Sequence, residues 1–240
     1  MEAKAIYLDE VDSTNRYLLE YQPTEGEGAT ICVADFQTAG RGCGSNSWES
    51  ERGKNLLFSL LIHPTDIEAR EKFHISMAIS LAICDAMQSY GMKDVSVKWP
   101  NDIYWKDKKL CGILIENRLS GTFIRDSIIG IGLNVNQDVF LSDAPNPVSM
   151  RQILGREFNR DEVLRRILAK LNVCRCMVDF TYMRYNAMLY RRGKGFFPFR
   201  DASGDFMAEI LETDRSGLLM LRKQGGEVQS YAFKEVQFII

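Results

Sequence analysis

The sequence predicts an α+β protein in which a mixed, largely antiparallel sheet with packed helices is followed by a small β-barrel. Four strand-like segments between residues 95 and 135 follow one another through short turns, which is typical of antiparallel pairing. Residues 75–87 place apolar side chains on a single helical face. After residue 195, short apolar runs alternate with glycine-containing turns, as in small barrels. We therefore expect a large domain at 1–190 and a small one at 191–240.

Strands are expected in the first part of the chain at residues 5–8, 30–36 and 56–62. The polar run 12–15 supplies cap-type residues for a helix after the first strand. A long glycine-rich segment at 37–55 separates the second and third strands, and its length favours a functional role. The helix over 75–87 ends before Gly91 and is expected in the core.

The four strands of the middle region are expected at 95–99, 103–105, 109–117 and 123–135. Asn159 followed by Glu162 resembles a capping box that opens a helical region running towards Leu189. The barrel strands are expected near Met207, Leu218, Tyr231 and Val236.

Composition argues against several classes of protein. The 30 basic and 32 acidic side chains nearly cancel, so a broad basic surface for nucleic acid is not expected. The longest apolar stretch, around 56–62, is far shorter than the roughly 20 residues of a membrane-spanning helix. His63 and His74 lack the spacing of a zinc site. Six cysteines without a Cys-x-x-Cys pair, and a start without a signal-peptide pattern, favour the cytoplasm.

Two short segments carry candidate chemistry. Residues 40–45, Gly-Arg-Gly-Cys-Gly-Ser, put backbone amides beside a guanidinium and can wrap an anion, although a flexible surface loop has the same composition. Residues 98–102, Lys-Trp-Pro-Asn-Asp, gather a cation, an amide and a carboxylate at a proline turn, although ordinary charged turns do so too. Lys109 follows, and period-two alternation predicts that it shares a face with Cys111 and Ile113.

Five segments together resemble the biotin protein ligase family in order and spacing: 13–15, 37–48, 98–102, 109–114 and 130–136. The resemblance implies a catalytic domain like that of class II synthetases, followed by a barrel of the Src-homology-3 type. Family members that are also repressors carry an N-terminal helix-turn-helix domain. Here the catalytic pattern starts within the first fifteen residues, so we expect the monofunctional type.

The family's activity implies a role for each charged residue. The carboxylate of biotin attacks the α-phosphorus of ATP, pyrophosphate leaves, and an acceptor lysine then attacks the mixed anhydride. Arg41, Lys98 and Lys109 would neutralise carboxylate and phosphate charge, with Lys109 the leading catalytic residue. Asp102 would either accept a proton from the acceptor lysine or position Lys98 by an ion pair. Mg²⁺ is expected with the triphosphate.

The resemblance also implies two sets of binding residues. Biotin would contact Ser13, Thr14, Asn15, Gln37, Gly40, Arg41, Gly42, Cys43, Lys109 and Gly112. ATP would contact Arg41, Trp48, Lys98, Asn101, Lys109 and Asn134, with Trp48 stacked on adenine. The chain departs from the family at Cys43, where many members carry arginine, and at Ser45, where glycine is common.

The expected acceptor is the biotin carboxyl carrier protein domain of a biotin-dependent carboxylase, and the chain is expected to be a monomer or a homodimer. One rival is a lipoate or octanoate ligase or transferase, in which Cys111 beside Lys109 would accept the acyl group. Another is a non-catalytic sensor that holds biotinyl-adenylate. The glycine-rich loop and the 98–102 motif favour biotin, and the retention of every charged motif favours an enzyme.

Overall fold

The computed structural model describes residues 3–24, 26–44, 46–64, 66–142, 146–174 and 178–240. Seven strands form the large sheet in the order β1-β2-β3-β7-β6-β5-β4. Their bounds are β1 Ala3–Val11, β2 Ala29–Gln37, β3 Leu56–Ile62, β4 Val95–Lys98, β5 Asp102–Trp105, β6 Lys108–Ser120 and β7 Phe123–Leu133. β1 pairs with β2 in parallel and the other neighbours pair antiparallel, which confirms the mixed, largely antiparallel sheet.

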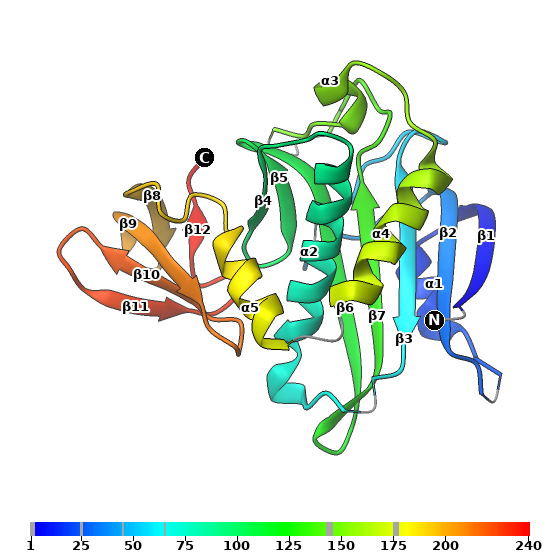
Figure 1. Cartoon of the computed structure of the whole chain (residues 1–240), viewed down its shortest axis with the longest axis horizontal. Coiled ribbons are helices and arrows are strands. Elements are labelled where there is room, and N and C mark those ends of the chain that lie inside the picture. Colours follow the sequence, from blue (N-terminus) through cyan, green and yellow to red (C-terminus); the bar gives the residue numbers. More distant parts are fainter. Residues whose placement is uncertain (1–2, 25, 45, 65, 143–145, 175–177) are drawn as a thin grey trace.

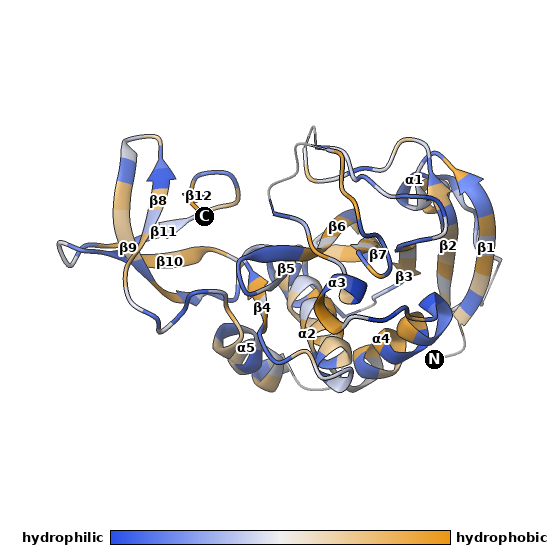
Figure 2. Cartoon of the chain, turned by 90° about the horizontal axis from the view of Figure 1, so that it is seen from above, coloured by the Kyte–Doolittle hydropathy of each residue, from blue (hydrophilic) through white to orange (hydrophobic). Residues whose placement is uncertain are grey.

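Helices cover both faces of this sheet, because its central strands are apolar on both sides. α2 Phe73–Ser89, α4 Arg160–Cys174 and α5 Val178–Ala187 lie on one face, and α1 Thr14–Glu20 lies on the other (Figures 1 and 2). Alternate residues of β3 show the division: Phe58 packs in the main core with α2, whereas Leu61 packs with Leu18 of α1. The short helix α1 covers only part of the sheet face on which it lies. The functional motifs lie on the rest of that face.

A second, five-stranded antiparallel sheet lies beside β4, β5 and α5 (Figure 1). Its order is β11-β10-β9-β8-β12, with β8 Phe197–Asp201, β9 Gly204–Thr213, β10 Leu219–Lys223, β11 Val228–Tyr231 and β12 Gln237–Phe238. Four strands match the expected runs, while β8 is an addition. The two sheets are joined where the buried Trp99 indole nitrogen donates to the Gly217 carbonyl at 2.9 Å.

The helical connections differ from the prediction in one place. A short helix, α3 Met150–Leu154, is held by a capping box between Ser149 and Gln152 and was not predicted, because five residues give too little periodicity. The predicted helical region after Asn159 contains α4 and α5. A 3-10 turn, η1 Ala69–Glu71, precedes α2. No helix in the described ranges is long and apolar enough to cross a membrane.

Candidate active site

The motif segments meet over the face of the large sheet that lies opposite α2, where they surround a cavity of about 200 Å³. The start of α1, the loop after β2, the β4–β5 turn, β6 and β7 all contribute walls. Thirteen of the predicted residues line it: Ser13, Thr14, Asn15, Gln37, Arg41, Gly42, Cys43, Trp48, Lys98, Asn101, Asp102, Lys109 and Gly112. Segments that lie far apart in the sequence are thus brought to one place.

The floor of the cavity carries no side chains. Gly112 of β6 pairs directly with Gly132 of β7, and Gly130 lies two residues before Gly132 on the same face. A Cβ on Gly132 would lie 2.4 Å from a carbon of the Trp48 indole, and one on Gly130 would lie 2.2 Å from Asn15 Oδ1. The glycines therefore allow a flat ring and an amide to lie directly on the strands.

A hydrogen-bonded network forms the polar end of the cavity. The Thr14 amide donates to Gln37 Oε1 at 2.7 Å. Ser59 Oγ, on β3, lies 2.7 Å from Thr14 Oγ1 and 2.6 Å from Asn15 Oδ1. Asn15 Nδ2 donates to Glu116 Oε2 at 2.9 Å. Because these partners fix one another's orientation, the polar groups are already arranged for a ligand.

Two of the three predicted cations are paired with carboxylates. Arg41 donates to both oxygens of Glu116, at 2.9 and 3.3 Å. Lys109 Nζ lies 2.9 Å from Asp102 Oδ1, with 28% and 20% of the two side chains exposed. The ion pair of Asp102 is therefore with Lys109, and the expected ion pair with Lys98 is absent among the described contacts.

Lys98 is held differently. Its ammonium lies 5.4 Å from the Tyr104 ring centre and 4.9 Å from that of Phe238. Burial lowers the pKa of Lys98, an effect that Asp102 opposes and that Lys109 and Arg191 strengthen. A cation on ring faces keeps its N–H donors available for an incoming anion.

The predicted face of Lys109 is wrong, and a β-bulge is the reason. The pairing of β6 with β5 skips Leu110, so regular alternation breaks beside Lys109. Cys111 and Ile113 lie in the apolar core, whereas the Lys109 side chain lies on the glycine face, 3.4 Å from the position of a Gly112 Cβ. Burial raises the pKa of the Cys111 thiol well above its usual range.

Two predicted residues do not line the cavity. Asn134 is buried and donates to the Val148 carbonyl at 3.2 Å and to that of Lys109 at 3.5 Å, so it fixes the start of β6. The Gly40 carbonyl accepts the Trp48 amide at 2.9 Å and closes the glycine-rich loop. Both residues shape the site from behind.

Within the same loop, Cys43 Sγ accepts a hydrogen bond from Asn101 Nδ2 at 3.3 Å, and Asn101 also donates to the Ile113 carbonyl. Asn101 thereby ties the β4–β5 turn to both β6 and the loop. Ser45 lies outside the described residues.

Sequence reasoning missed three contributors. Ser59 and Glu116 are polar residues inside otherwise apolar strands, a pattern that marks a buried polar role and was available in the sequence. Phe233 lines the cavity from the segment before β12. Nothing local to Phe233 predicts this, because its place depends on how the second sheet docks.

The described residues contain no group of three or more His, Cys, Asp or Glu side chains able to hold a metal. Asp102 is the acidic residue among those that line the cavity, and it already pairs with Lys109. This composition fits Mg²⁺ carried mainly by nucleotide phosphates, since Mg²⁺ commonly keeps its waters and takes few protein ligands.

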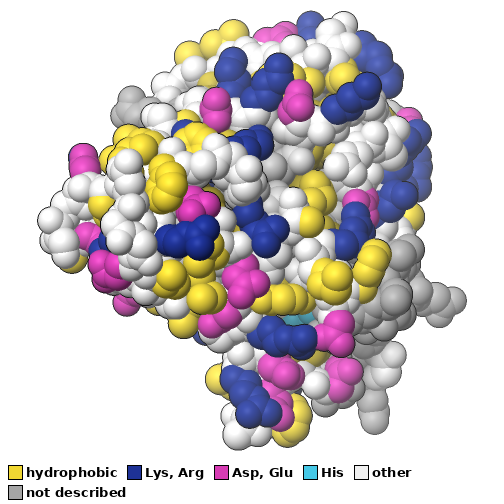
Figure 3. Space-filling model, turned by 60° about the vertical axis from the view of Figure 1, so that its left-hand side comes forward, with side chains coloured by type: hydrophobic (Ala, Val, Ile, Leu, Met, Phe, Trp, Pro, Cys, Tyr) yellow, Lys and Arg dark blue, Asp and Glu magenta, His cyan; other side chains and the backbone are white. Residues whose placement is uncertain are grey.

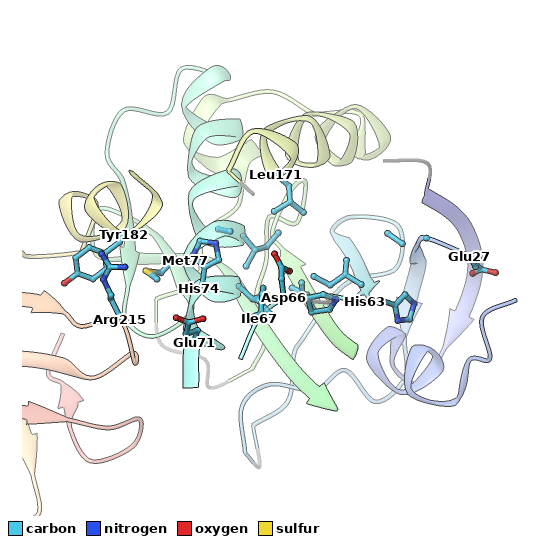
Figure 4. A pocket seen from close by; sticks show the side chains of 18 residues that line it. Glu27, His63, Asp66, Ile67, Glu71, His74, Met77, Leu171, Tyr182 and Arg215 are labelled. Atoms are coloured by element: carbon cyan, nitrogen blue, oxygen red, sulfur yellow. The ribbon is translucent and has the colours of Figure 1, made fainter. Parts of the chain in front are cut away.

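A larger cavity of about 590 Å³ lies on the face of the sheet that α2 covers, between the end of β3 and the start of α2 (Figure 4). Its lining runs from Glu27 to Arg215 and includes His63 and His74 among mostly apolar side chains. None of the predicted site residues is among its described lining. The size of a cavity therefore does not locate the chemistry here, whereas the charged and polar groups do.

Three cations around a floor of glycines, with a fixed polar network at one end, are suited to a ring-bearing, negatively charged small molecule. The model of the Biotin/lipoate A/B protein ligase family matches residues 7–134, a span that holds most of the cavity residues. The chain belongs to this family.

Relatives and solved structures extend the match over the second sheet. The bifunctional ligase/repressor BirA of Bacillus spizizenii is 31% identical over 95% of this chain and 72% of its own length. Human biotin–protein ligase is 29% identical over 94% of this chain and 33% of its own length. The Aquifex aeolicus biotin protein ligase in complex with biotin and ATP superposes with a TM-score of 0.81, 26% identity, and coverage of 98% and 99% of the two chains. The predicted α+β fold, a large mixed sheet with packed helices followed by a small β-sheet, is thereby confirmed.

Proposed function

We propose that this chain is a biotin protein ligase, which activates biotin with ATP and transfers it to a lysine of an acceptor protein. The observation that carries the proposal is the meeting of Arg41, Lys98 and Lys109 over the glycine floor, next to the Ser13–Asn15 network. The relatives named above are biotin ligases, and one related structure holds both biotin and ATP. The enzyme class follows from that agreement.

In the first step, a carboxylate oxygen of biotin attacks the α-phosphorus of ATP, and pyrophosphate leaves. Both reactants are anions, so their approach needs positive charge fixed in advance. Lys109 on β6, held by Asp102, and Lys98 at the end of β4, with its donors available, supply that charge. Arg41 adds a third cation from the loop. Mg²⁺ bound to the phosphates would offset the charge of the leaving pyrophosphate.

In the second step, the acceptor lysine attacks the carbonyl of biotinyl-adenylate, and AMP leaves as the anhydride bond breaks. The attacking amine loses a proton. Asp102 lines the cavity and is a candidate to take it, but its Oδ1 already accepts from Lys109. We therefore assign Asp102 first to positioning Lys109.

The binding roles follow the geometry of the cavity. Ser13, Thr14, Asn15 and Gln37 lie at the polar end and suit the ureido ring of biotin, which offers both donors and acceptors. Gly112 and Gly132 let the Trp48 indole lie directly on the strands, and Trp48 is the aromatic residue placed to stack on adenine. The rings of biotin would then lie beside Gly112, between this indole and the polar end of the cavity. Gly40, Gly42, Cys43 and Asn101 form the loop and turn that enclose the adenylate, and Asn134 acts through Lys109.

The rival reading as a lipoate or octanoate transferase needs a reactive thiol in the cavity. The Cys111 thiol instead lies in the core with a raised pKa, so it is a poor nucleophile. Two alternatives remain: a lipoate ligase that uses no thiol, and a sensor that never transfers biotin. One experiment distinguishes both from a biotin ligase. Purified chain is incubated with ATP, Mg²⁺ and either biotin or lipoate, with and without an acceptor domain. We expect adenylate formation and labelling of the acceptor in the incubation with biotin, and neither in the incubation with lipoate. Labelling of the acceptor with lipoate, or formation of biotinyl-adenylate without transfer to the acceptor, would overturn the proposal.

The proposed acceptor is the biotin carboxyl carrier protein domain of a carboxylase. A cytoplasmic location and a monomer or homodimer remain part of the proposal, as does the division into a catalytic domain, 1–190, and a second domain, 191–240. Nucleic acid is not a proposed partner. On the face drawn in Figure 3, Lys and Arg side chains are interspersed with Asp and Glu instead of forming one basic area.

A further inference from the structure

The two lysines of the cavity are held by different means. Lys109 has a carboxylate partner at 2.9 Å. In the described part of the chain, the Lys98 ammonium has neither a hydrogen bond nor an ion pair, and its close neighbours are the faces of Tyr104 and Phe238. A partly buried lysine with no fixed acceptor would sample many rotamers, so the rings must define where its charge lies.

The two rings come from different sheets. Tyr104 lies on β5, two residues after Asp102, and is part of the large sheet. Phe238 lies on β12, at the C-terminal end of the second sheet, 4.9 Å from the Phe199 ring and 6.3 Å from that of Tyr190. The contact with Lys98 therefore spans the junction between the two sheets.

The backbone on both sides of Phe238 is fixed. Phe238 pairs with Phe199 of β8, and the next residue, Ile239, donates its amide to the Pro198 carbonyl at 3.1 Å. The Ile239 carbonyl accepts from Arg191 at 2.9 Å. A ring held in this way can restrict the ammonium that lies against it.

We infer that Phe238 is a positioning residue for the adenylation step: the second sheet delivers its ring to Lys98 and holds that ammonium towards the reacting phosphate. The inference rests on the proposed function, because it assigns Lys98 to the nucleotide. It gives the second sheet a direct part in the chemistry of the large domain. Replacing the ring by an aliphatic side chain should lower the rate of adenylation about tenfold, the effect of losing one desolvated cation–ring contact.

The test compares Phe238→Leu with Phe238→Tyr and with a matched control, Phe206→Leu. Phe206 lies in the same sheet and also faces a lysine, Lys223 at 5.0 Å, but Lys223 is not among the residues that line the cavity, whereas Lys98 is. We expect biotinyl-adenylate formation to fall about tenfold in Phe238→Leu, to recover in Phe238→Tyr, and to stay within about twofold of wild type in Phe206→Leu. Equal losses in both leucine variants, or no loss in Phe238→Leu, would overturn the inference.

The pH dependence separates positioning from general loss of stability. The Phe238 ring stabilises the charged ammonium of Lys98, so replacing the ring by leucine should lower the pKa of Lys98. The fall in adenylation rate at alkaline pH should then begin at a lower pH. The charged and titratable groups that face Lys98 are Asp102, Lys109, Arg191 and Tyr104, and all remain in the variant. An alkaline fall in adenylation rate that begins at the same pH as in the wild type, or at a higher pH, counts against the inference.

A measurement without turnover distinguishes failure of the inference from failure of the proposed function. The lysines are ¹³C-methylated, the Lys98 resonance is identified by its loss in Lys98→Arg, and its pKa is titrated in each variant. We expect a lower pKa in Phe238→Leu than in wild type, and the wild-type value in Phe206→Leu. An unchanged Lys98 pKa in Phe238→Leu refutes the contact, whereas absence of adenylation by the wild-type chain refutes only the function.

Discussion

Replacing Asp102 by asparagine tests what the carboxylate does. Asp102→Asn keeps the size of the side chain and one oxygen that can accept from Lys109, but it removes the negative charge that now lies 2.9 Å from Nζ. Lys109 keeps its own charge and loses the partner that defines its position. We therefore expect adenylation to slow without being abolished.

The exposure of the pair sets the size of the effect. The two side chains are 28% and 20% exposed, between a surface ion pair worth about 0.2–1 kcal/mol and a buried one worth about 3–5 kcal/mol when broken. We take about 1.5 kcal/mol, which is roughly a tenfold lower rate of biotinyl-adenylate formation.

The two steps are measured separately. Adenylation is followed in single turnover with labelled biotin and ATP, and transfer is started from biotinyl-adenylate added directly with an acceptor domain. If Asp102 positions Lys109, transfer falls no more than adenylation does. A transfer rate reduced by about 10² to 10⁴ with a nearly normal adenylation rate would identify Asp102 as the general base instead.

The control is Asp35→Asn, which breaks a 2.8 Å pair with Arg160 outside the cavity. This variant should leave both rates within about twofold of wild type, since surface pairs contribute little. Wild-type adenylation in Asp102→Asn would refute the reasoning outright, because it would mean that Lys109 needs no partner to act.

Three further substitutions follow from the site. Lys109→Ala should lower adenylation by at least about a hundredfold with little change in circular dichroism, and near-normal adenylation would contradict its catalytic role. Gly130→Ala would place a Cβ 2.2 Å from Asn15 Oδ1, so the biotin dissociation constant, measured by calorimetry, should rise; an unchanged constant would remove Asn15 from the biotin site. Cys43→Arg should slow release of labelled biotinyl-adenylate roughly ten- to a hundredfold by adding a charge-assisted contact, and an unchanged off-rate would show that Arg41 and the loop amides suffice.

Much of the chain's local structure was determined by the sequence alone. The strand at Leu56–Ile62 and the helix around residues 75–87 follow from apolar runs and a 3.6-residue period, because those patterns depend on neighbours along the chain. Thirteen of the predicted site residues line one cavity. They could be predicted because the motifs that carry them occur in the order and spacing of a known family.

Tertiary structure decided what local patterns could not. The bulge beside Leu110 moved Lys109 onto the glycine face, and no alternation rule reveals a single skipped residue. The partner of Asp102 turned out to be Lys109, since strand pairing and side-chain reach, not sequence distance, set ion pairs. Phe238 reached Lys98 from 140 positions away only because the second sheet docks against β4 and β5. The sequence determines which chemical groups the chain carries and much of their local conformation. Contacts between distant segments arise from packing, which no short stretch of residues encodes.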